Sequence, residues 1–114
     1  MSDEYKIVAT PTFKITLTRL RHFLSRKFTQ SHAEQTLATI KSTVLLLAQN
    51  PYAAPVSDRL SSLGITNYRQ LLVDKHNLVY YRIDDSTKQV ILVLVLDSRQ
   101  SIKQLLYETM IYLD

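Results

Sequence analysis

The stretch HNLVYYRIDDSTKQVILVLVLDSRQ, residues 76–100, decides the fold of this chain. It holds two apolar runs, LVYYRI (78–83) and QVILVLVL (89–96), which are rich in the β-branched and aromatic residues that favour strands. Between them lies the polar sequence DDSTK, whose residue types are typical of tight turns. The pattern therefore predicts a β-hairpin.

The turn and the second strand of this hairpin carry two further expectations. Asp84 and Asp85 resemble a pair of carboxylates for acid–base chemistry, but their place between two strands favours a turn. Leu94, Val95 and Leu96 continue the apolar run without alternation, which predicts a strand that is covered on both faces. We therefore expect the second strand to be central in its sheet.

A third strand, YRQLLV (68–73), precedes the hairpin and is joined to it by the turn DKHN (74–77). The chain before it opens with a short β-prone run, YKIVA (5–9). Thr10 then provides a helix cap and Pro11 suits the first helical turn. A strand is thus expected to lead directly into a helix.

Two amphipathic helices are predicted between these strands. The first has an apolar stripe at helical spacing, formed by Phe13, Leu17, Leu20, Leu24 and Phe28. In the second, Ser31 and Glu34 have the spacing of a capping box. Its apolar stripe is Leu37, Ile40, Val44 and Leu47, and the run ends at Pro51. The two helices are expected to form an antiparallel hairpin.

The remaining segments complete one domain over residues 1–114. The segment 51–67 holds two of the three prolines and the only glycine, and it is interpreted as a crossing loop. The segment 101–114 is interpreted as a helix, with apolar residues Ile102, Leu105, Leu106 and Met110. The predicted fold class is α+β with the order β-α-α-β-β-β-α, a helical hairpin packed on a small, twisted, mainly antiparallel sheet.

Composition limits the possible functions. The chain has 114 residues, with 14 Lys and Arg against 10 Asp and Glu, and its formal net charge of +4 favours an acidic partner or nucleic acid. It has no cysteine, which excludes disulfides, thiolate nucleophiles and Cys-based zinc sites. His22 and His32 have no partner at metal-binding spacing, so neither a metal nor a cofactor is expected. Without a leader or a long apolar run, a cytoplasmic protein with no membrane association is expected.

The chain resembles the RelE/ParE superfamily of bacterial toxins from type II toxin-antitoxin modules over nearly its full length. The resemblance rests on TPTFKITLTRL leading into a helical hairpin that ends in LLAQNP, and on KHNLVYYRID followed by VLVLDSRQSIKQLL. It implies a cognate acidic antitoxin as partner, in a hetero-oligomeric complex. It also implies one of two cellular targets, because ParE-like members block DNA gyrase and RelE-like members cut mRNA on the ribosome. The long helical hairpin slightly favours the ParE branch, and an inactive basic interaction module is the third alternative.

The RelE-like reaction needs no metal and uses positioned cations and tyrosines, for which this chain offers five candidates: Arg69, Lys75, His76, Arg99 and Tyr107. By resemblance, Arg69 stands at a catalytic lysine, Arg99 at the arginine that ends the last strand, and Tyr107 at a late tyrosine. Lys75 and His76 are substitutes for missing groups. Leu71 and Asn77 fall where two further cations are usual, so the match to the nuclease pattern is incomplete.

A purely structural interpretation of the same residues is that they are solvated or ion-paired strand ends, and that Tyr107 faces the core. The alternative follows from antiparallel pairing, since the turns DKHN and DSRQ should lie at the same end of the sheet. Lys75, His76 and Arg99 would then converge, and Arg69 on the neighbouring strand would add to a positive patch. Such a patch would suit phosphate or an acidic antitoxin tail.

Overall fold

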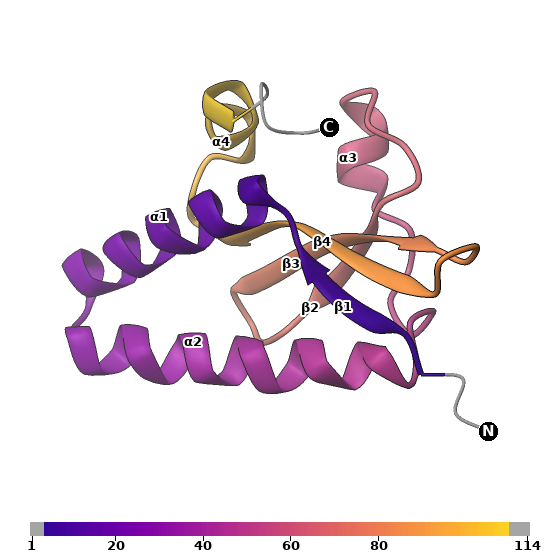
Figure 1. Ribbon diagram of the computed structural model, residues 1–114. Coiled ribbons are helices and arrows are strands. Elements are labelled where there is room, and N and C mark those ends of the chain that lie inside the picture. Colours follow the sequence, from indigo (N-terminus) through magenta and orange to yellow (C-terminus); the bar gives the residue numbers. More distant parts are fainter. Residues whose placement is uncertain (1–3, 110–114) are drawn as a thin grey trace.

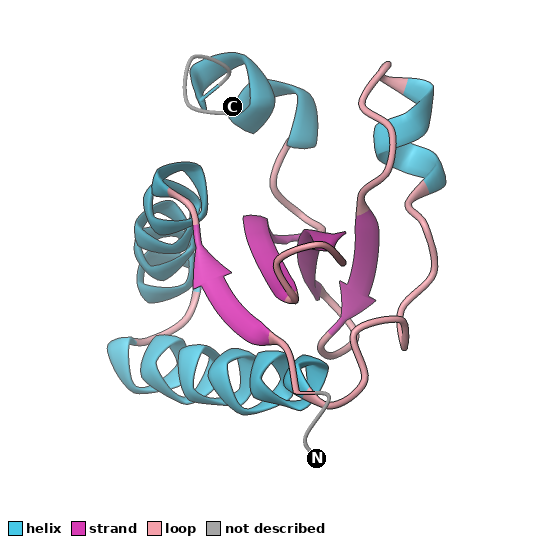
Figure 2. Cartoon of the chain, turned by 45° about the vertical axis from the view of Figure 1, so that its right-hand side comes forward, coloured by secondary structure: helices cyan, strands magenta, loops and turns pink. Residues whose placement is uncertain are grey.

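The computed structural model describes residues 4–109, in which a four-stranded sheet carries helices on both of its faces (Figures 1 and 2). In chain order the elements are β1 (Lys6–Ala9), α1 (Pro11–Lys27), α2 (Gln30–Leu45), the 3-10 turn η1 (Leu46–Ala48), α3 (Asp58–Ser62), β2 (Arg69–Leu72), β3 (Asn77–Asp84), β4 (Gln89–Asp97) and α4 (Ile102–Thr109). The predicted α+β class and order of major elements are confirmed.

The strands lie in the order β1-β4-β3-β2. β2 pairs with β3, and β3 with β4, in antiparallel orientation, whereas β1 lies parallel to β4. The single parallel pair follows from the helical hairpin, because α1 and α2 carry the chain away between β1 and the antiparallel strands (Figure 1). The sheet is therefore mainly antiparallel, as the sequence predicts.

β4 is an inner strand with core on both faces, which confirms the expectation from its unbroken apolar run. On one face Val90, Leu92 and Val95 pack in a core that α1 and α2 cover. On the other face the β4 side chains pack with Leu60 of α3 and Leu105 of α4. Figure 2 shows the two helical layers on opposite sides of the strands. The last two helices thus close a second, smaller core.

A register shift interrupts the β3–β4 ladder between Tyr80 and Tyr81. Tyr80 pairs with Leu94 and Tyr81 with Leu92, so one residue of β4 is left over. As a result Val93 and Leu94, which are consecutive, both enter the core beneath α3 and α4. The bulge explains how an apolar run without alternation fits between two cores.

A threonine caps the N-terminus of each helix of the hairpin. The side chain of Thr10 accepts a hydrogen bond from the amide of Phe13 at 3.1 Å, so the predicted cap of α1 is confirmed. The expected capping box at Ser31 is wrong, because Thr29 caps α2 and accepts from the amide of His32 at 3.0 Å. Only Phe28 separates the end of α1 from Thr29, so α2 begins earlier than the apolar stripe indicates.

The expectation of an uninterrupted loop over residues 51–67 is wrong, because this segment contains α3. Ser57 caps the helix by accepting from the amide of Leu60 at 3.1 Å, and the side chain of Leu60 is fully buried. This five-residue helix contains one apolar residue, Leu60, which is too few to show a helical period in the sequence. Gly64, with φ of +82°, follows the helix in the left-handed conformation that glycine adopts most readily.

The last helix, α4, was predicted from its apolar spacing. Leu105 is buried against the sheet, as expected, whereas Met110 of the predicted stripe lies outside the described residues. None of the helices within residues 4–109 combines the length and the apolar character needed to cross a membrane.

Candidate functional site

The turns that follow β2 and β4 meet at one end of the sheet. Asn77 is paired with Asp97 across the β3–β4 ladder, and the amide of Ser98 donates to the carbonyl of His76 at 2.6 Å. Lys75 and His76 in the first turn therefore lie at the same sheet end as Arg99 in the second. This convergence was predicted from the sequence, and the structure confirms it as a placement.

Arg99 is held by a carboxylate of its own turn. Its Nε donates to Asp97 Oδ1 at 2.8 Å and its second guanidinium nitrogen donates to Oδ2 at 2.5 Å, while its backbone amide also donates to Oδ1. The guanidinium stacks on the Phe28 ring at 4.9 Å, at the end of α1. Arg99 thus closes an ion pair and covers an aromatic ring.

The carboxylate of Asp97 is buried, and its side chain has no exposed surface. Burial acts to raise the pKa of Asp97, but the hydrogen bonds donated by Arg99 outweigh it, so the pKa lies below its ordinary value. The same contact raises the pKa of Arg99. A charged carboxylate at this depth requires its partner, which binds Arg99 more firmly than a surface ion pair would.

The turn before β3 is organised by Asp74. One of its oxygens accepts from the amides of His76 and Asn77, both at 2.9 Å, and the Asn77 side-chain amide donates to both oxygens. Burial acts to raise the pKa of Asp74, but these hydrogen bonds lower it overall. Lys75 lies at the tip of this turn and is exposed. The exposed cation Lys75 therefore lies beside the hydrogen-bonded carboxylate of Asp74.

The expectation that Arg69 joins this group is wrong. Arg69 pairs with Tyr81, whereas Leu72, at the other end of β2, pairs with Leu78 beside the turn. Three residues of extended strand, about 10 Å, separate the two ends of β2. Arg69 instead donates to the carbonyl of Ala54 at 2.6 Å and lies 4.7 Å from the ring centroid of Tyr52. It braces the segment before α3.

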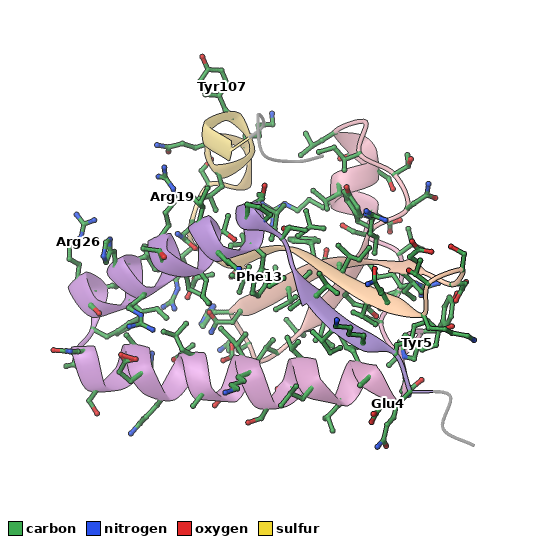
Figure 3. All side chains as sticks on the ribbon, viewed as in Figure 1. Glu4, Tyr5, Phe13, Arg19, Arg26 and Tyr107 are labelled. Carbon is green, nitrogen blue, oxygen red and sulfur yellow. The ribbon has the colours of Figure 1, made fainter. Side chains whose placement is uncertain are left out.

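Tyr107 does not face the core. Its side chain is 79% exposed and points away from the sheet (Figure 3). α4 packs on the sheet through Leu105, and a residue two positions later on a helix lies on a different face. Tyr107 is therefore exposed to solvent, and Arg69 lies at the end of β2 away from the turn that holds Lys75 and His76.

A cluster that the sequence did not indicate lies at the opposite end of the sheet. Asp85, in the β3–β4 turn, accepts hydrogen bonds from Tyr5 at 2.6 Å and from Tyr52. Both bonds lower the pKa of Asp85, and the bond from Tyr5 has the larger effect. The bond to Asp85 in turn raises the pKa of Tyr52. Arg69 and Lys88 lie over the rings of Tyr52 and Tyr5. The cluster joins four segments of the chain, at Tyr5, Tyr52, Arg69 and the turn of Asp85 and Lys88.

Asp84 has the turn role that the sequence predicts. It accepts from the amide and hydroxyl of Ser86 and from the amide of Thr87. Lys88, the last residue of this turn, has a positive φ of 56°. Within residues 4–109 no three His, Cys, Asp or Glu side chains are grouped so that they could hold a metal ion.

Comparison with protein-family models gives a match over residues 7–102 to the ParE toxin of type II toxin-antitoxin systems of the parDE type. The match covers most of the chain, from β1 to the start of α4. The chain belongs to the ParE toxin family. It is therefore a toxin of the RelE/ParE superfamily, as the hairpin and its flanking motifs indicated.

The fold of this ParE-family chain is similar to that of a solved toxin-antitoxin complex, RelBE2 from Mycobacterium tuberculosis. The TM-score is 0.61 at 18% sequence identity, and the alignment covers 82% of this chain and 98% of the other. At this identity the likeness concerns the fold alone. No curated protein sequence gives a significant match.

Proposed function

We propose that this ParE-family toxin arrests bacterial growth by binding DNA gyrase, and that it does not cut mRNA. The observation that carries the proposal is the ion pair between Arg99 and Asp97. Arg99 is the cation best placed for the nuclease reaction, and its guanidinium is already bound by this carboxylate. Metal-independent RNA cleavage needs cations that are free to stabilise the phosphate as negative charge develops on it. An arginine whose guanidinium already faces a carboxylate supplies little additional positive charge.

The other candidate groups support the same proposal. Arg69 lies toward the opposite end of β2 and Tyr107 points away from the sheet. Leu71 packs in the core beneath the helical hairpin, and Asn77 is buried and engaged by Asp74. These placements support the proposal, because Arg69 is engaged at Ala54, Tyr107 is exposed, and Leu71 and Asn77 carry no charge.

We infer that the partner that neutralises the toxin is an antitoxin with an acidic segment that is disordered until it binds. The similar RelBE2 structure is a toxin-antitoxin complex, and the formal net charge of +4 on this chain favours an acidic partner. Co-expression should yield a stable hetero-oligomer in the cytoplasm, where gyrase also acts. A neighbouring acidic gene product that neither co-purifies with the toxin nor relieves growth arrest would contradict this inference.

The test of the target is controlled expression in a susceptible bacterium, followed by parallel measurement of DNA supercoiling and of mRNA cleavage. Purified toxin should inhibit supercoiling by gyrase and leave mRNA on programmed ribosomes intact. Cleavage of mRNA with normal supercoiling would refute the proposal. Neither effect, with no growth arrest, would favour an inactive interaction module.

One observation favours the ribonuclease alternative, namely the convergence of Lys75, His76 and Arg99 at one sheet end. If the toxin cuts mRNA, Arg99→Ala should reduce the cleavage rate about a hundredfold, as expected for loss of one electrostatic contact in the transition state. Arg69→Ala should then have little effect, because its side chain is directed to Ala54 and Tyr52. Lys88→Glu, at the opposite turn, is the matched control.

A further inference from the structure

The first helix is unusually basic. α1 contains five lysines and arginines and no acidic residue: Lys14, Arg19, Arg21, Arg26 and Lys27. Arg21 is paired with Glu34 of α2 at 3.5 Å. Arg19 and Arg26 lie about two turns apart on the helix, and Figure 3 shows both projecting toward the side on which α4 lies. Their seven-residue separation spans about 10 Å along the helix axis.

This basic face forms one wall of a cavity of about 630 Å³ between α1 and the start of α4. The cavity is lined on α1 by Arg19, His22, Phe23, Arg26 and Lys27, and on the other side by Gln100, Ser101, Gln104 and Leu105. Cations thus form one wall, and amide and hydroxyl side chains form most of the other. None of these described residues carries a carboxylate.

A smaller cavity of about 300 Å³ lies on the other side of the same helix start. Arg59, Ser62 and Leu63 line it from α3 and the residue after it, and Ser101 and Lys103 line it at the start of α4. Ser101 borders both cavities, so their lining residues form a band on the two sides of the beginning of α4. We name this band the cationic track, after its basic residues Arg19, His22, Arg26, Lys27, Arg59 and Lys103.

We propose that the cationic track binds the phosphate backbone of duplex DNA. The inference rests on the proposed action on gyrase, because the DNA would be the segment that gyrase holds while the toxin is bound. Backbone contacts to DNA are made by Arg, Lys, Ser and Gln side chains, which are the types that line the track. The track would add DNA contacts to those that the toxin makes with the enzyme.

An acidic peptide fits the track less well. Helical peptides that bind in grooves are anchored by apolar side chains, so their sites offer a broad apolar floor. Among the described residues that line the two cavities, the apolar ones are Phe23, Leu63 and Leu105. Leu105 is buried, and the other two are partly buried in the two cores. The exposed part of this described lining is therefore mostly cationic or hydrogen-bonding.

Single-stranded nucleic acid also fits less well than a duplex. Proteins that bind single strands stack bases on exposed aromatic rings. Phe23 is the one aromatic residue among the described residues that line the track, and the ammonium of Lys27 lies 6.0 Å from its ring centroid. A contact to the backbone alone, without base stacking, is the mode that suits a duplex.

The test is fluorescence anisotropy of a labelled DNA duplex with the purified full-length toxin across a salt series. Each phosphate contact contributes about −0.9 to the slope of log K against log salt. Arg26→Gln and Lys103→Gln should each reduce the size of that slope by about one and lower the affinity several-fold at moderate salt. Lys41→Gln, an exposed cation of α2 outside both cavities, is the matched control and should change neither.

Circular dichroism should show that all three variants remain folded. Equal binding by Arg26→Gln, Lys103→Gln and Lys41→Gln would overturn the proposal, and so would tighter binding to polyglutamate, to single-stranded DNA or to duplex RNA. Gyrase inhibition by the same samples separates the two proposals. A toxin that inhibits gyrase but does not bind DNA would refute the track alone. One that binds DNA through Arg26 and Lys103 but does not inhibit gyrase would refute the proposed target.

Discussion

The guanidinium of Arg99 and the buried carboxylate of Asp97 are joined by two hydrogen bonds of 2.8 and 2.5 Å. The arginine side chain is 32% exposed and the aspartate side chain is fully buried. The pair lies at the end of β4, and the Arg99 guanidinium also lies over the ring of Phe28, the residue that follows α1. The sequence indicates a functional arginine and the end of a strand. In the structure these two residues form one ion pair that stabilises the fold.

Arg99→Ala should lower the free energy of unfolding by about 1–3 kcal/mol, because it leaves the Asp97 carboxylate buried with one backbone hydrogen bond. The value is set below that for a wholly buried pair, since the guanidinium is partly solvated. Urea denaturation provides the measurement. Lys41→Ala, on the outer face of α2, should change the stability by less than about 0.5 kcal/mol. Equal stability of the two variants would show that the pair contributes nothing.

Acid should destabilise the toxin through Asp97 and Asp74, whose pKa values are both lowered by folding. In the unfolded chain these carboxyls have a pKa of about 3.9, so the folded state binds fewer protons. Their contribution is therefore complete above about pH 5 and is lost as the pH falls through the lowered values. Urea midpoints measured against pH should fall in this range. Asp97→Asn should flatten the profile, and an unchanged acid slope would contradict the assignment.

Asp85 should titrate differently once its two tyrosine partners are removed. The hydroxyls of Tyr5 and Tyr52 lower its pKa, so the double change Tyr5→Phe and Tyr52→Phe should raise that pKa toward its ordinary value. The carboxyl resonance of Asp85, followed by NMR against pH, measures the shift directly. Asp84, whose pKa is lowered by Ser86 and Thr87, is an internal control in the same spectra. A parallel shift of both aspartates would refute a specific role of the tyrosines.

Much of the fold could be predicted because its signals are local and repeated. The hairpin of residues 78–96 and the stripe from Phe13 to Leu24 each show several periods of their pattern, whereas α3 has only one buried apolar residue, Leu60. The Tyr5–Asp85 bond joins residues 80 positions apart, so no local pattern indicates it. A parallel β1–β4 pair likewise has no signature in either strand.

The candidate site was predicted in position but not in detail. Pairing of β3 with β4 was sufficient to bring His76 and Arg99 to one sheet end. The same argument could have excluded Arg69, since it begins a strand that runs toward the turn and so lies at the far end. The direction of the Arg99 side chain depends on burial of Asp97, which the sequence does not reveal. The two cavities at α4 depend on how three helices pack, and spacing along one helix cannot show them.

Beyond the end of β1, a buried threonine of α1 accepts a hydrogen bond from the backbone of β4. β1 pairs with β4 only as far as Leu92, and beyond it the amide of Val95 donates to the hydroxyl of Thr16 on α1 at 3.1 Å. Thr16→Val keeps the shape but leaves that buried amide without an acceptor, which should cost about 1–3 kcal/mol of unfolding free energy. Thr18→Val removes an exposed hydroxyl bonded within its own helix, and it should be nearly neutral. Equal urea midpoints for the two variants would contradict the role of Thr16.

The two adjacent tyrosines of β3 should respond in opposite ways to loss of their hydroxyls. Tyr81 donates to the carbonyl of Pro51 at 2.6 Å, so Tyr81→Phe leaves a buried acceptor unpaired and should cost about 1–2 kcal/mol. The hydroxyl of Tyr80 is buried without a hydrogen-bond partner among the described residues. Tyr80→Phe removes this unpaired group and should therefore be neutral or stabilising.

Alkaline titration gives an independent check on these tyrosines. Burial raises the pKa of both, while Arg59 near Tyr80 and a backbone contact to Tyr81 partly oppose the effect. Since the folded state keeps both phenols protonated to higher pH, stability should fall as the pH rises above about 10, the ordinary tyrosine pKa. Tyr80→Phe should reduce that loss without lowering stability at neutral pH. A large loss of stability in Tyr80→Phe at neutral pH would show that its hydroxyl has a partner after all.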